Sequence, residues 1–284
     1  MIPAAFDYIR AGSLAEAIDL LQQDPEDTKL VAGGHTLIPT LKLRLASPTL
    51  LVDIRGIGDL KGISIDNKAI RIGALTTHAE LLASEPLHEA LPIFRQAANR
   101  IADPQVRNRG TIGGSLANAD PAADWPAVMI ALNAELEIAG PKGSRRVASR
   151  DFFVDVFSTA LEASEVLAAV HVPRPASGTR FTYRKIRHPA SGYAVVGVAA
   201  GVRVEAGVVA GISIGVTGAA SHAFSGDPAT QFLMTKPLSG EAIEEAARLL
   251  SEATECLSDH YAAAEYRASL VRTETKRALL ALAA

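Results

Sequence analysis

The sequence predicts an α+β protein of two domains, and three observations carry this prediction. The chain has 284 residues, and at roughly 100 to 200 residues per domain this length indicates two domains, or at most three. Segments with strand and helix patterns alternate irregularly up to about Pro175, which is typical of an α+β arrangement and not of a doubly wound sheet. Beyond a linker-like stretch at 173–178, the chain continues with several strand patterns and then two helix patterns. This order predicts a second, smaller α+β domain.

The first helix is predicted to begin at Ser13. Ser13 and Glu16 have the spacing of a capping box, and an apolar periodicity follows through Ala17, Leu20 and Leu21. Short apolar runs and a pair of glycines then organise the chain up to residue 53. They predict a strand at 29–31, a glycine loop at 32–36, a helical turn at 37–43 and a strand at 50–53.

The next part of the first domain is expected to be mainly helical. Thr77 and Glu80 repeat the capping-box spacing before Leu81 and Leu82. Apolar residues at helical spacing and a second pair of glycines follow. The patterns predict a strand at 69–73, a helix at 87–101, a glycine loop at 111–115 and a buried helix at 125–132.

The smaller domain is predicted from strand patterns followed by helix patterns. The strands lie at 181–185, 194–205 and 208–216, and the helices at 239–257 and 262–282. Ala206 and Gly207 join the last two strands as a turn. Cys256 falls within the first of these helix patterns, where a lone cysteine is expected to be a small core residue.

The composition excludes several classes of protein. Lys and Arg total 28 against 31 for Asp and Glu, a formal net charge of −3, so a dedicated nucleic-acid binder is not expected. The apolar stretches are interrupted every few residues and none approaches the ~20 residues of a membrane span. The first eight residues lack the pattern of a secretory signal, so we expect a cytoplasmic protein.

Cysteine and histidine usage limits the metal chemistry of the chain. Cys256 is the only cysteine, which excludes an internal disulfide, a zinc site of several thiolates and an iron–sulfur cluster held by this chain alone. The histidines show no spacing typical of metal ligands, so no metal site is predicted. Metal-centred redox chemistry is therefore expected on another polypeptide.

Two glycine loops carry the main signal for function. Ala32-Gly33-Gly34-His35-Thr36, taken alone, is explained equally well by an ordinary tight turn. The same pattern, two glycines followed by a polar residue, recurs in Thr111-Ile112-Gly113-Gly114-Ser115. Two such loops can present backbone N–H groups and a hydroxyl to a diphosphate. Neither loop has Walker or Rossmann spacing, so a dinucleotide held between two separate loops is the favoured hypothesis. We expect Gly114→Val to abolish binding of the dinucleotide, because a β-branched side chain disfavours the required backbone conformation and fills the space of the diphosphate.

The chain resembles a known family in these two loops, in the segment 101–124 and in the pair Tyr266-Arg267. The chain is similar to the FAD-binding medium subunits of the molybdenum hydroxylase (xanthine dehydrogenase) family, most of all to their carbon monoxide dehydrogenase branch. The likeness extends from Met1 to the C-terminal helix. Ser115 stands where the family often has Asn, and Thr36 where Ser is common.

The resemblance implies a fold. It is an FAD-binding domain of the vanillyl-alcohol-oxidase type, at 1–175, with subdomains at about 1–55 and 56–175. A smaller α+β C-terminal flavoprotein domain would follow at 176–284.

The resemblance also implies a function, as the FAD-carrying electron-transfer subunit of a molybdenum hydroxylase. FAD is bound without a covalent bond, and electrons reach it from the 2Fe-2S clusters of a small partner subunit. A large partner subunit carries the molybdenum cofactor, and the complex is a dimer of heterotrimers, a heterohexamer. The substrate would be that of a carbon monoxide dehydrogenase or of a related aldehyde or N-heterocycle dehydrogenase.

The resemblance further implies the residues that bind the cofactor, and it implies no catalytic residue in this chain. They are Ala32, Gly33, Gly34, His35, Thr36 and Leu37 on one side of the diphosphate, Thr111, Gly113, Gly114 and Ser115 on the other, Asp124 at the sugar and phosphate end, and Ile101, Ala102, Leu167, Lys185 and Tyr193 around the flavin.

Alternatives stay open at this point for several of these residues. His35 could anchor the flavin covalently, Tyr193 could be a core residue, and Lys185 could be a solvated strand lysine. Asp124 could only cap the following helix, and Arg145 with Arg146 could form a solvated turn.

Alternatives also stay open for the function and for the C-terminal helix. The chain could be a self-sufficient flavin oxidoreductase that binds its own substrate over FAD, or a non-catalytic diphosphate-binding module. The C-terminal helix repeats Tyr266, Leu270 and Val271 at helical spacing beside Arg267 and Arg272. Lys276 and Arg277 also lie beside this stripe. The stripe could pack on its own domain, but the resemblance to subunits of larger complexes favours the docking of a partner chain.

Overall fold

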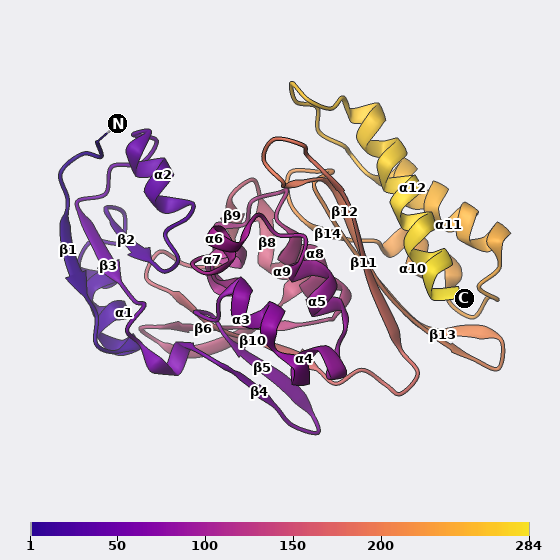
Figure 1. The fold of residues 1–284 in the computed structure, drawn as a ribbon, viewed down its shortest axis with the longest axis horizontal. Coiled ribbons are helices and arrows are strands. Elements are labelled where there is room, and N and C mark those ends of the chain that lie inside the picture. Colours follow the sequence, from indigo (N-terminus) through magenta and orange to yellow (C-terminus); the bar gives the residue numbers. More distant parts are fainter. Residues whose placement is uncertain (1, 284) are drawn as a thin grey trace.

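The computed structural model describes residues 2–283. Figure 1 shows its main sheets in a row, with a three-stranded sheet at the N-terminal end, a five-stranded sheet in the middle and a four-stranded sheet toward the C-terminus. A two-stranded hairpin completes the strands of the described chain. Helices cover faces of these sheets, so the predicted α+β class is confirmed.

The N-terminal sheet is parallel, with the order β1-β3-β2. Its elements are β1 Asp7–Arg10, α1 Leu14–Gln23, β2 Thr28–Val31, α2 Leu37–Lys42 and β3 Leu50–Asp53. Ser13 caps α1 by accepting the N–H of Glu16 at 3.1 Å, which confirms the predicted helix start. Ala17, Ile18 and Leu21 of α1 are buried in a core that extends to the middle sheet.

The middle sheet is antiparallel, with the order β4-β5-β10-β6-β7. Its strands are β4 Ile63–Ile65, β5 Ala69–Gly73, β6 Glu135–Gly140, β7 Gly143–Ala148 and β10 Val166–Pro173. The remaining elements of this part are η1 Gly58–Leu60, α3 His78–Ala83, α4 Glu85–Ala90, α5 Ile93–Ala98, α6 Pro104–Arg107, α7 Ile112–Asn118, α8 Asp124–Ala131, α9 Ser149–Phe152, β8 Phe153–Asp155 and β9 Ser158–Thr159. The capping box of Thr77 and Glu80 at the start of α3 is complete, as predicted.

α8 is the central helix of the molecule. All of its residues are buried, because it lies between the middle part and the C-terminal sheet. The packing is close enough that a Cβ at Gly215 would come within 2.1 Å of the Ala127 carbonyl oxygen. The buried helix predicted at 125–132 is confirmed.

Two local predictions in this part are wrong. The single helix expected at 87–101 is divided into α4 and α5, since Pro92 cannot donate the N–H that would continue α4. Arg145 and Arg146 lie in β7 and not in a turn. Arg145 donates to both carboxylate oxygens of Glu165, at 2.8 and 2.7 Å.

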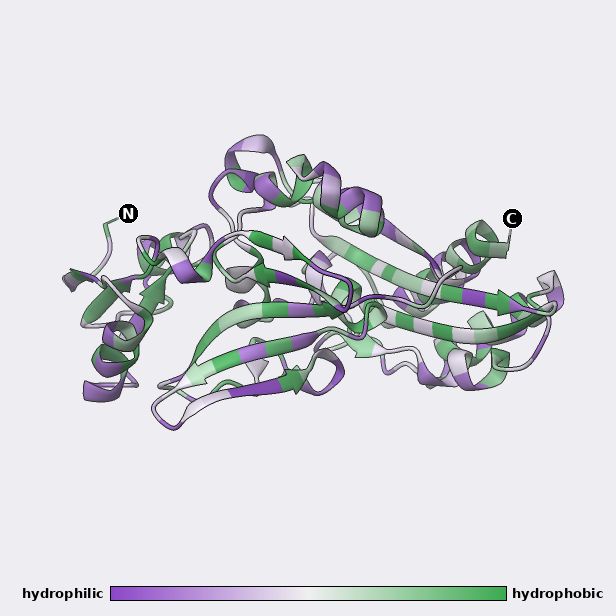
Figure 2. Ribbon diagram, turned by 90° about the horizontal axis from the view of Figure 1, so that it is seen from below, coloured by the Kyte–Doolittle hydropathy of each residue, from purple (hydrophilic) through white to green (hydrophobic). Residues whose placement is uncertain are grey.

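The C-terminal sheet is antiparallel, with the order β11-β12-β13-β14. Its strands are β11 Arg180–Arg187, β12 Ala194–Glu205, β13 Val208–Thr217 and β14 Phe224–Ser225, and its helices are α10 Asp227–Leu233, α11 Gly240–Ala253 and α12 Ala264–Ala283. Ala206 and Gly207 both have positive φ, 48° and 81°, and form the predicted turn. Figure 2 shows the long strands of this sheet mostly green, because their Val, Ile and Ala side chains form the core beneath the helices.

Two predictions for the C-terminal helices need correction. α11 ends at Ala253, so Cys256 lies outside the helix, half-buried at the edge of the core. Burial raises the pKa of the Cys256 thiol, which fits a packed side chain and not a nucleophile. α10, the short helix after β14, was not predicted.

The expectation that α12 docks a partner through its apolar stripe is also wrong. Leu270 and Val271 are buried in the core of their own domain. Arg272 forms an ion pair with Glu244 of α11 at 2.6 Å. Of the three apolar residues of the stripe, Tyr266 alone is half exposed, so the helix packs on its own sheet.

No helix within residues 2–283 is both long and apolar enough to cross a membrane.

Candidate cofactor-binding site

The first glycine segment is a loop between β2 and α2, half-buried at residues 32–34 and exposed at His35 and Thr36. Within residues 2–283, the backbone N–H groups of residues 33–36 have no acceptor in the protein. Gly34 has a φ of +77°, and a Cβ at Gly33 would lie 2.3 Å from the Arg109 carbonyl oxygen. Both glycines are therefore needed, one for its conformation and one for the close approach of two segments. Successive unpaired N–H groups of this kind form an anion-binding concavity.

The second glycine segment is not a loop but the first turn of α7, which corrects the prediction. Its N–H groups are already paired, from Ile112 to the Thr76 oxygen at 3.0 Å and from Gly113 to the Ala74 oxygen at 2.8 Å. The N–H of Gly114 donates to Oγ1 of Thr111 at 3.0 Å. This segment therefore does not present a row of unpaired N–H groups.

The two glycines of this turn have different roles. Gly113 is required by packing, because a Cβ there would lie 2.4 Å from Cβ of Ala74. Gly114 has a helical conformation, and a Cβ would meet only Oγ1 of Thr111, at 2.9 Å. The expectation that the backbone at Gly114 excludes valine is therefore wrong.

The two segments line one cleft, as the two-loop hypothesis requires. Ala32 and Gly33 of the first segment and Thr111 of the second belong to its lining. The lining also includes three cationic residues that were not predicted, Arg55, Lys61 and Arg109.

Arg55 is held at this cleft by Asp53. Its guanidinium donates to both oxygens of Asp53, at 2.9 and 2.7 Å, and the hydroxyl of Tyr8 donates to the same carboxylate at 2.5 Å. The hydrogen bonds from Arg55 hold the pKa of Asp53 well below its usual range. The only signal in the sequence was an Arg two residues beyond the end of a strand, which is too common to be diagnostic.

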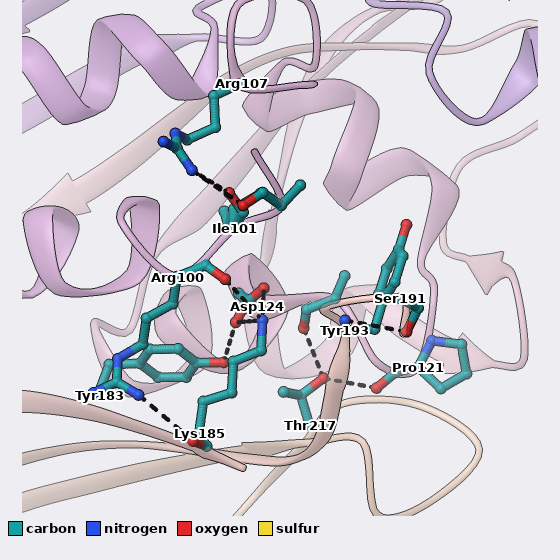
Figure 3. A network of polar contacts seen from close by, with 12 residues as sticks. Arg100, Ile101, Arg107, Pro121, Asp124, Tyr183, Lys185, Ser191, Tyr193 and Thr217 are labelled. Atoms are coloured by element: carbon teal, nitrogen blue, oxygen red, sulfur yellow. Dashed lines mark hydrogen bonds and ion pairs between the residues drawn. The ribbon is translucent and has the colours of Figure 1, made fainter. Parts of the chain in front are cut away.

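A buried polar network lies at the boundary between the middle part and the C-terminal sheet (Figure 3). Lys185 of β11 contacts the carboxylate of Asp124 at 2.8 Å, and the hydroxyl of Tyr183 donates to the same carboxylate at 2.6 Å. Lys185 Nζ also donates to the carbonyl oxygen of Arg100 at 3.1 Å. Burial raises the pKa of Asp124 and lowers the pKa of Lys185, whereas their mutual contact acts in the opposite direction on each.

The network decides two of the open alternatives. Lys185 is 7 % exposed and is not a solvated strand lysine. The N-cap of α8 is Ala123, and no side chain caps that helix, so capping is not the role of Asp124. Both oxygens of Asp124 are bound inside the protein, by Tyr183 and Lys185. Its place at the sugar and phosphate end of a cofactor stays a prediction.

The other residues expected near the flavin lie around this network. Arg107 donates to the carbonyl oxygens of Ile101 and Ala102, at 2.8 and 3.2 Å, and Ala102 has a φ of +41°. Leu167 is 5 % exposed and its side chain packs in the core of the middle part. His35 is exposed, with Nε2 3.4 Å from the Gln105 carbonyl oxygen. Their roles toward a cofactor stay predictions.

Tyr193 follows a tight turn and is 42 % exposed, so the reading as a core residue is wrong. Gly192 before it has a φ of +76°. Partial burial, and then the nearby carboxylates of Asp120 and Asp124, raise the pKa of the Tyr193 phenol. A large ring is thus presented beside the buried network.

His78 is a buried histidine beneath the wall of the cleft. Its Nδ1 accepts the indole N–H of Trp125 at 3.1 Å, and a Cβ at Gly110 would lie 2.8 Å from its Nε2. Burial lowers the pKa of His78 from 6.5 to about 4. The folded chain therefore binds fewer protons than the unfolded chain between these two values.

We expect this residue to make the protein sensitive to acid. The stability that neutral His78 contributes is complete above pH 6.5 and is lost as the pH falls toward 4. The free energy of unfolding should therefore fall by about 3 kcal/mol at pH 4. Urea unfolding at pH 7 and pH 4 checks this in the wild type and in His78→Gln, whose amide oxygen can still accept from Trp125. The variant should lose about 3 kcal/mol less than the wild type over this interval. Identical losses would contradict the assignment.

No group of three or more His, Cys, Asp or Glu side chains placed to hold a metal ion occurs within residues 2–283.

Comparisons with known proteins cover both parts of the chain. Residues 4–175 match the family described as "FAD binding domain in molybdopterin dehydrogenase". Residues 181–282 match the family described as "CO dehydrogenase flavoprotein C-terminal domain". The predicted order of an FAD-binding domain and a smaller C-terminal domain is thereby confirmed.

Two relatives and one solved structure match nearly the whole chain. The carbon monoxide dehydrogenase medium chain of Afipia carboxidovorans is 40 % identical over 279 residues, 98 % of this chain and 97 % of the relative. The 6-hydroxypseudooxynicotine dehydrogenase complex subunit alpha of Paenarthrobacter nicotinovorans is 36 % identical over 280 residues, 98 % of this chain and 95 % of the relative. A solved structure of carbon monoxide dehydrogenase from Hydrogenophaga pseudoflava superposes with a TM-score of 0.97 at 39 % identity, covering 99 % of this chain and 98 % of the other.

Proposed function

The chain belongs to the FAD-binding medium subunits of the molybdenum hydroxylases, and from this premise we propose that its cleft holds the diphosphate of FAD without a covalent bond. The observation that carries this proposal is the run of unpaired N–H groups at 33–36 next to a cleft that includes Arg55, Lys61 and Arg109. Donors and positive charge in one place fit a diphosphate.

The remaining cofactor contacts are proposed from the placement of the other predicted residues. Leu37 follows the free N–H groups at the start of α2, and Thr111 and Ser115 bring hydroxyl groups from α7. Lys185, held by Asp124, and the backbone at Ile101 and Ala102 would face the flavin. Leu167 can contribute only through its backbone, because its side chain is in the core.

FAD, when bound, can accept and release one or two electrons. The electrons would come from the 2Fe-2S clusters of a small partner chain and leave to an external acceptor. This chain has a single cysteine and cannot itself supply the several thiolates of a cluster. Its own contribution is to bind FAD, fix its orientation and control access to its ring.

The partners proposed for this chain are a large chain with the molybdenum cofactor and the small iron–sulfur chain, two copies of each, in the cytoplasm. The names of the relatives support this, since they are medium chains or subunits of complexes. The substrate would be chosen on the large chain. Relatives acting on carbon monoxide and on 6-hydroxypseudooxynicotine are similarly close, at 40 % and 36 % identity, so we propose a carbon monoxide dehydrogenase or a related aldehyde or N-heterocycle dehydrogenase.

We also propose the domain limits 1–175 and 176–284, with a division of the first domain near residue 55. The separate three-stranded and five-stranded sheets support the inner division. The gap between the two family matches, at 176–180, supports the outer one.

The experiment that tests the function uses the purified chain and anaerobic titration. We expect it to be yellow and to release FAD, about one per chain, into the supernatant after acid precipitation. Candidate substrates should leave its flavin oxidised, whereas the complex co-expressed with both partner chains should be bleached by one of them; dithionite is the control for reducibility. Bleaching of the isolated chain by a substrate would favour the self-sufficient flavin oxidoreductase instead.

A further inference from the structure

The turn that carries Tyr193 is organised around one imidazole. Nδ1 of His188 accepts the N–H groups of Ala190 and Ser191, both at 3.2 Å. The backbone closes the same turn, from His188 N–H to the Tyr193 oxygen at 2.8 Å and from Gly192 N–H to the His188 oxygen at 2.9 Å. Nδ1 is thus an acceptor here, and the conformation of the turn depends on it.

The imidazole is itself held from the other side by Tyr261. The two ring centroids are 4.1 Å apart, and Tyr261 lies in the connection between α11 and α12. This connection is fixed in turn by Asp259, whose Oδ1 accepts the N–H groups of Tyr261 and Ala262 at 2.9 and 2.8 Å. Its other oxygen forms an ion pair with Arg267 at 2.5 Å.

Tyr193 has few restraints of its own. Its side chain is 42 % exposed, and its N–H makes a long contact of 3.3 Å with Oγ of Ser191. Its carbonyl oxygen accepts the His188 N–H within the turn, and the N–H of the next residue, Ala194, donates to the Ala122 oxygen at 3.1 Å. The direction of its ring is therefore set by the turn before it.

We infer that His188 is a positioning residue: its Nδ1 fixes the turn that presents Tyr193 to the proposed flavin site, and its contact with Tyr261 ties this turn to the α11–α12 connection. The inference rests on the proposed function, because it places Tyr193 at a flavin. The contacts of His188 that support it do not depend on a cofactor.

Two substitutions of His188 distinguish the effect of losing its hydrogen-bond acceptor from the effect of losing its ring. In His188→Ala, the N–H groups of Ala190 and Ser191 lose their acceptor. In His188→Asn, Oδ1 can take the place of Nδ1. Amide hydrogen exchange on the chain without FAD should be about ten-fold faster at these two positions in His188→Ala and close to wild type in His188→Asn. Tyr261→Ala should increase exchange at the same amides, and Tyr261→Phe should not.

The holo-protein gives the second readout. His188→Ala should retain FAD but change its spectrum and its rate of reoxidation by oxygen, in the direction that Tyr193→Ala changes them. The double variant should add nothing to Tyr193→Ala. Unchanged amide exchange in His188→Ala would overturn the inference, with FAD bound or not, and so would a normal flavin in His188→Ala beside an altered one in Tyr193→Ala. A wild-type chain that takes up no FAD would overturn the proposed function instead.

Discussion

Gly33→Ala is expected to weaken FAD binding by about 100-fold while the chain stays folded. The added Cβ would lie 2.3 Å from the Arg109 oxygen and 2.9 Å from Cα of Gly110. Both are backbone atoms that cannot turn aside, so the loop must move away from this wall of the cleft. Loss of two charge-assisted hydrogen bonds, at about 1.5 kcal/mol each, corresponds to this factor.

Two matched variants show whether the effect is specific to the contact. Gly58→Ala adds the same methyl group between Arg55 and Lys61 in the sequence, at a position with nothing within 4 Å, and it should bind FAD normally. Gly114→Val, in the second glycine segment, should weaken FAD binding less than Gly33→Ala does, because only the Thr111 hydroxyl must move. Flavin content per chain and FAD fluorescence titration measure the affinity, and circular dichroism checks the fold. Normal FAD affinity in Gly33→Ala would contradict the role of the first loop.

Among the predictions of local structure, several that held were decided by neighbours in sequence. Ser13 and Thr77 cap helices because their partners, Glu16 and Glu80, lie three residues away. The turn at Ala206 and Gly207 is likewise a local matter. The pair Gly113-Gly114 shows the limit, because the same pattern fits a loop and a first helical turn. The distant contact with Ala74 decides between them.

The features that the sequence did not disclose depend on tertiary contacts. Arg55 and Lys61 lie more than twenty residues from Gly33 along the chain, and only the fold brings them to one cleft. The pairing of Asp124 with Lys185 joins segments 61 residues apart. Similarly, the apolar and basic residues of α12 predicted a docking surface, because the sequence does not show which sheet the helix packs on. α12 packs on β11 and β12, and that leaves Arg267 inside the protein.

Arg267→Met is expected to cost about 3 to 5 kcal/mol of unfolding free energy. Arg267 is 7 % exposed, and its guanidinium donates to the carbonyl oxygens of Val195 and Gly218 at 2.7 and 2.5 Å. It also pairs with Asp259. Methionine fills much of the volume but leaves both buried oxygens without a donor, and it releases the connection that Asp259 organises.

Arg272→Met on the same helix is the matched control. Arg272 pairs with Glu244 at the surface, where Lys276 remains as a second partner, so its loss should cost at most about 1 kcal/mol. Urea unfolding followed by circular dichroism compares the two variants with the wild type. Equal destabilisation would contradict the buried role of Arg267. A stable Arg267→Met chain that failed only to assemble with its partner chains would return this residue to an interface.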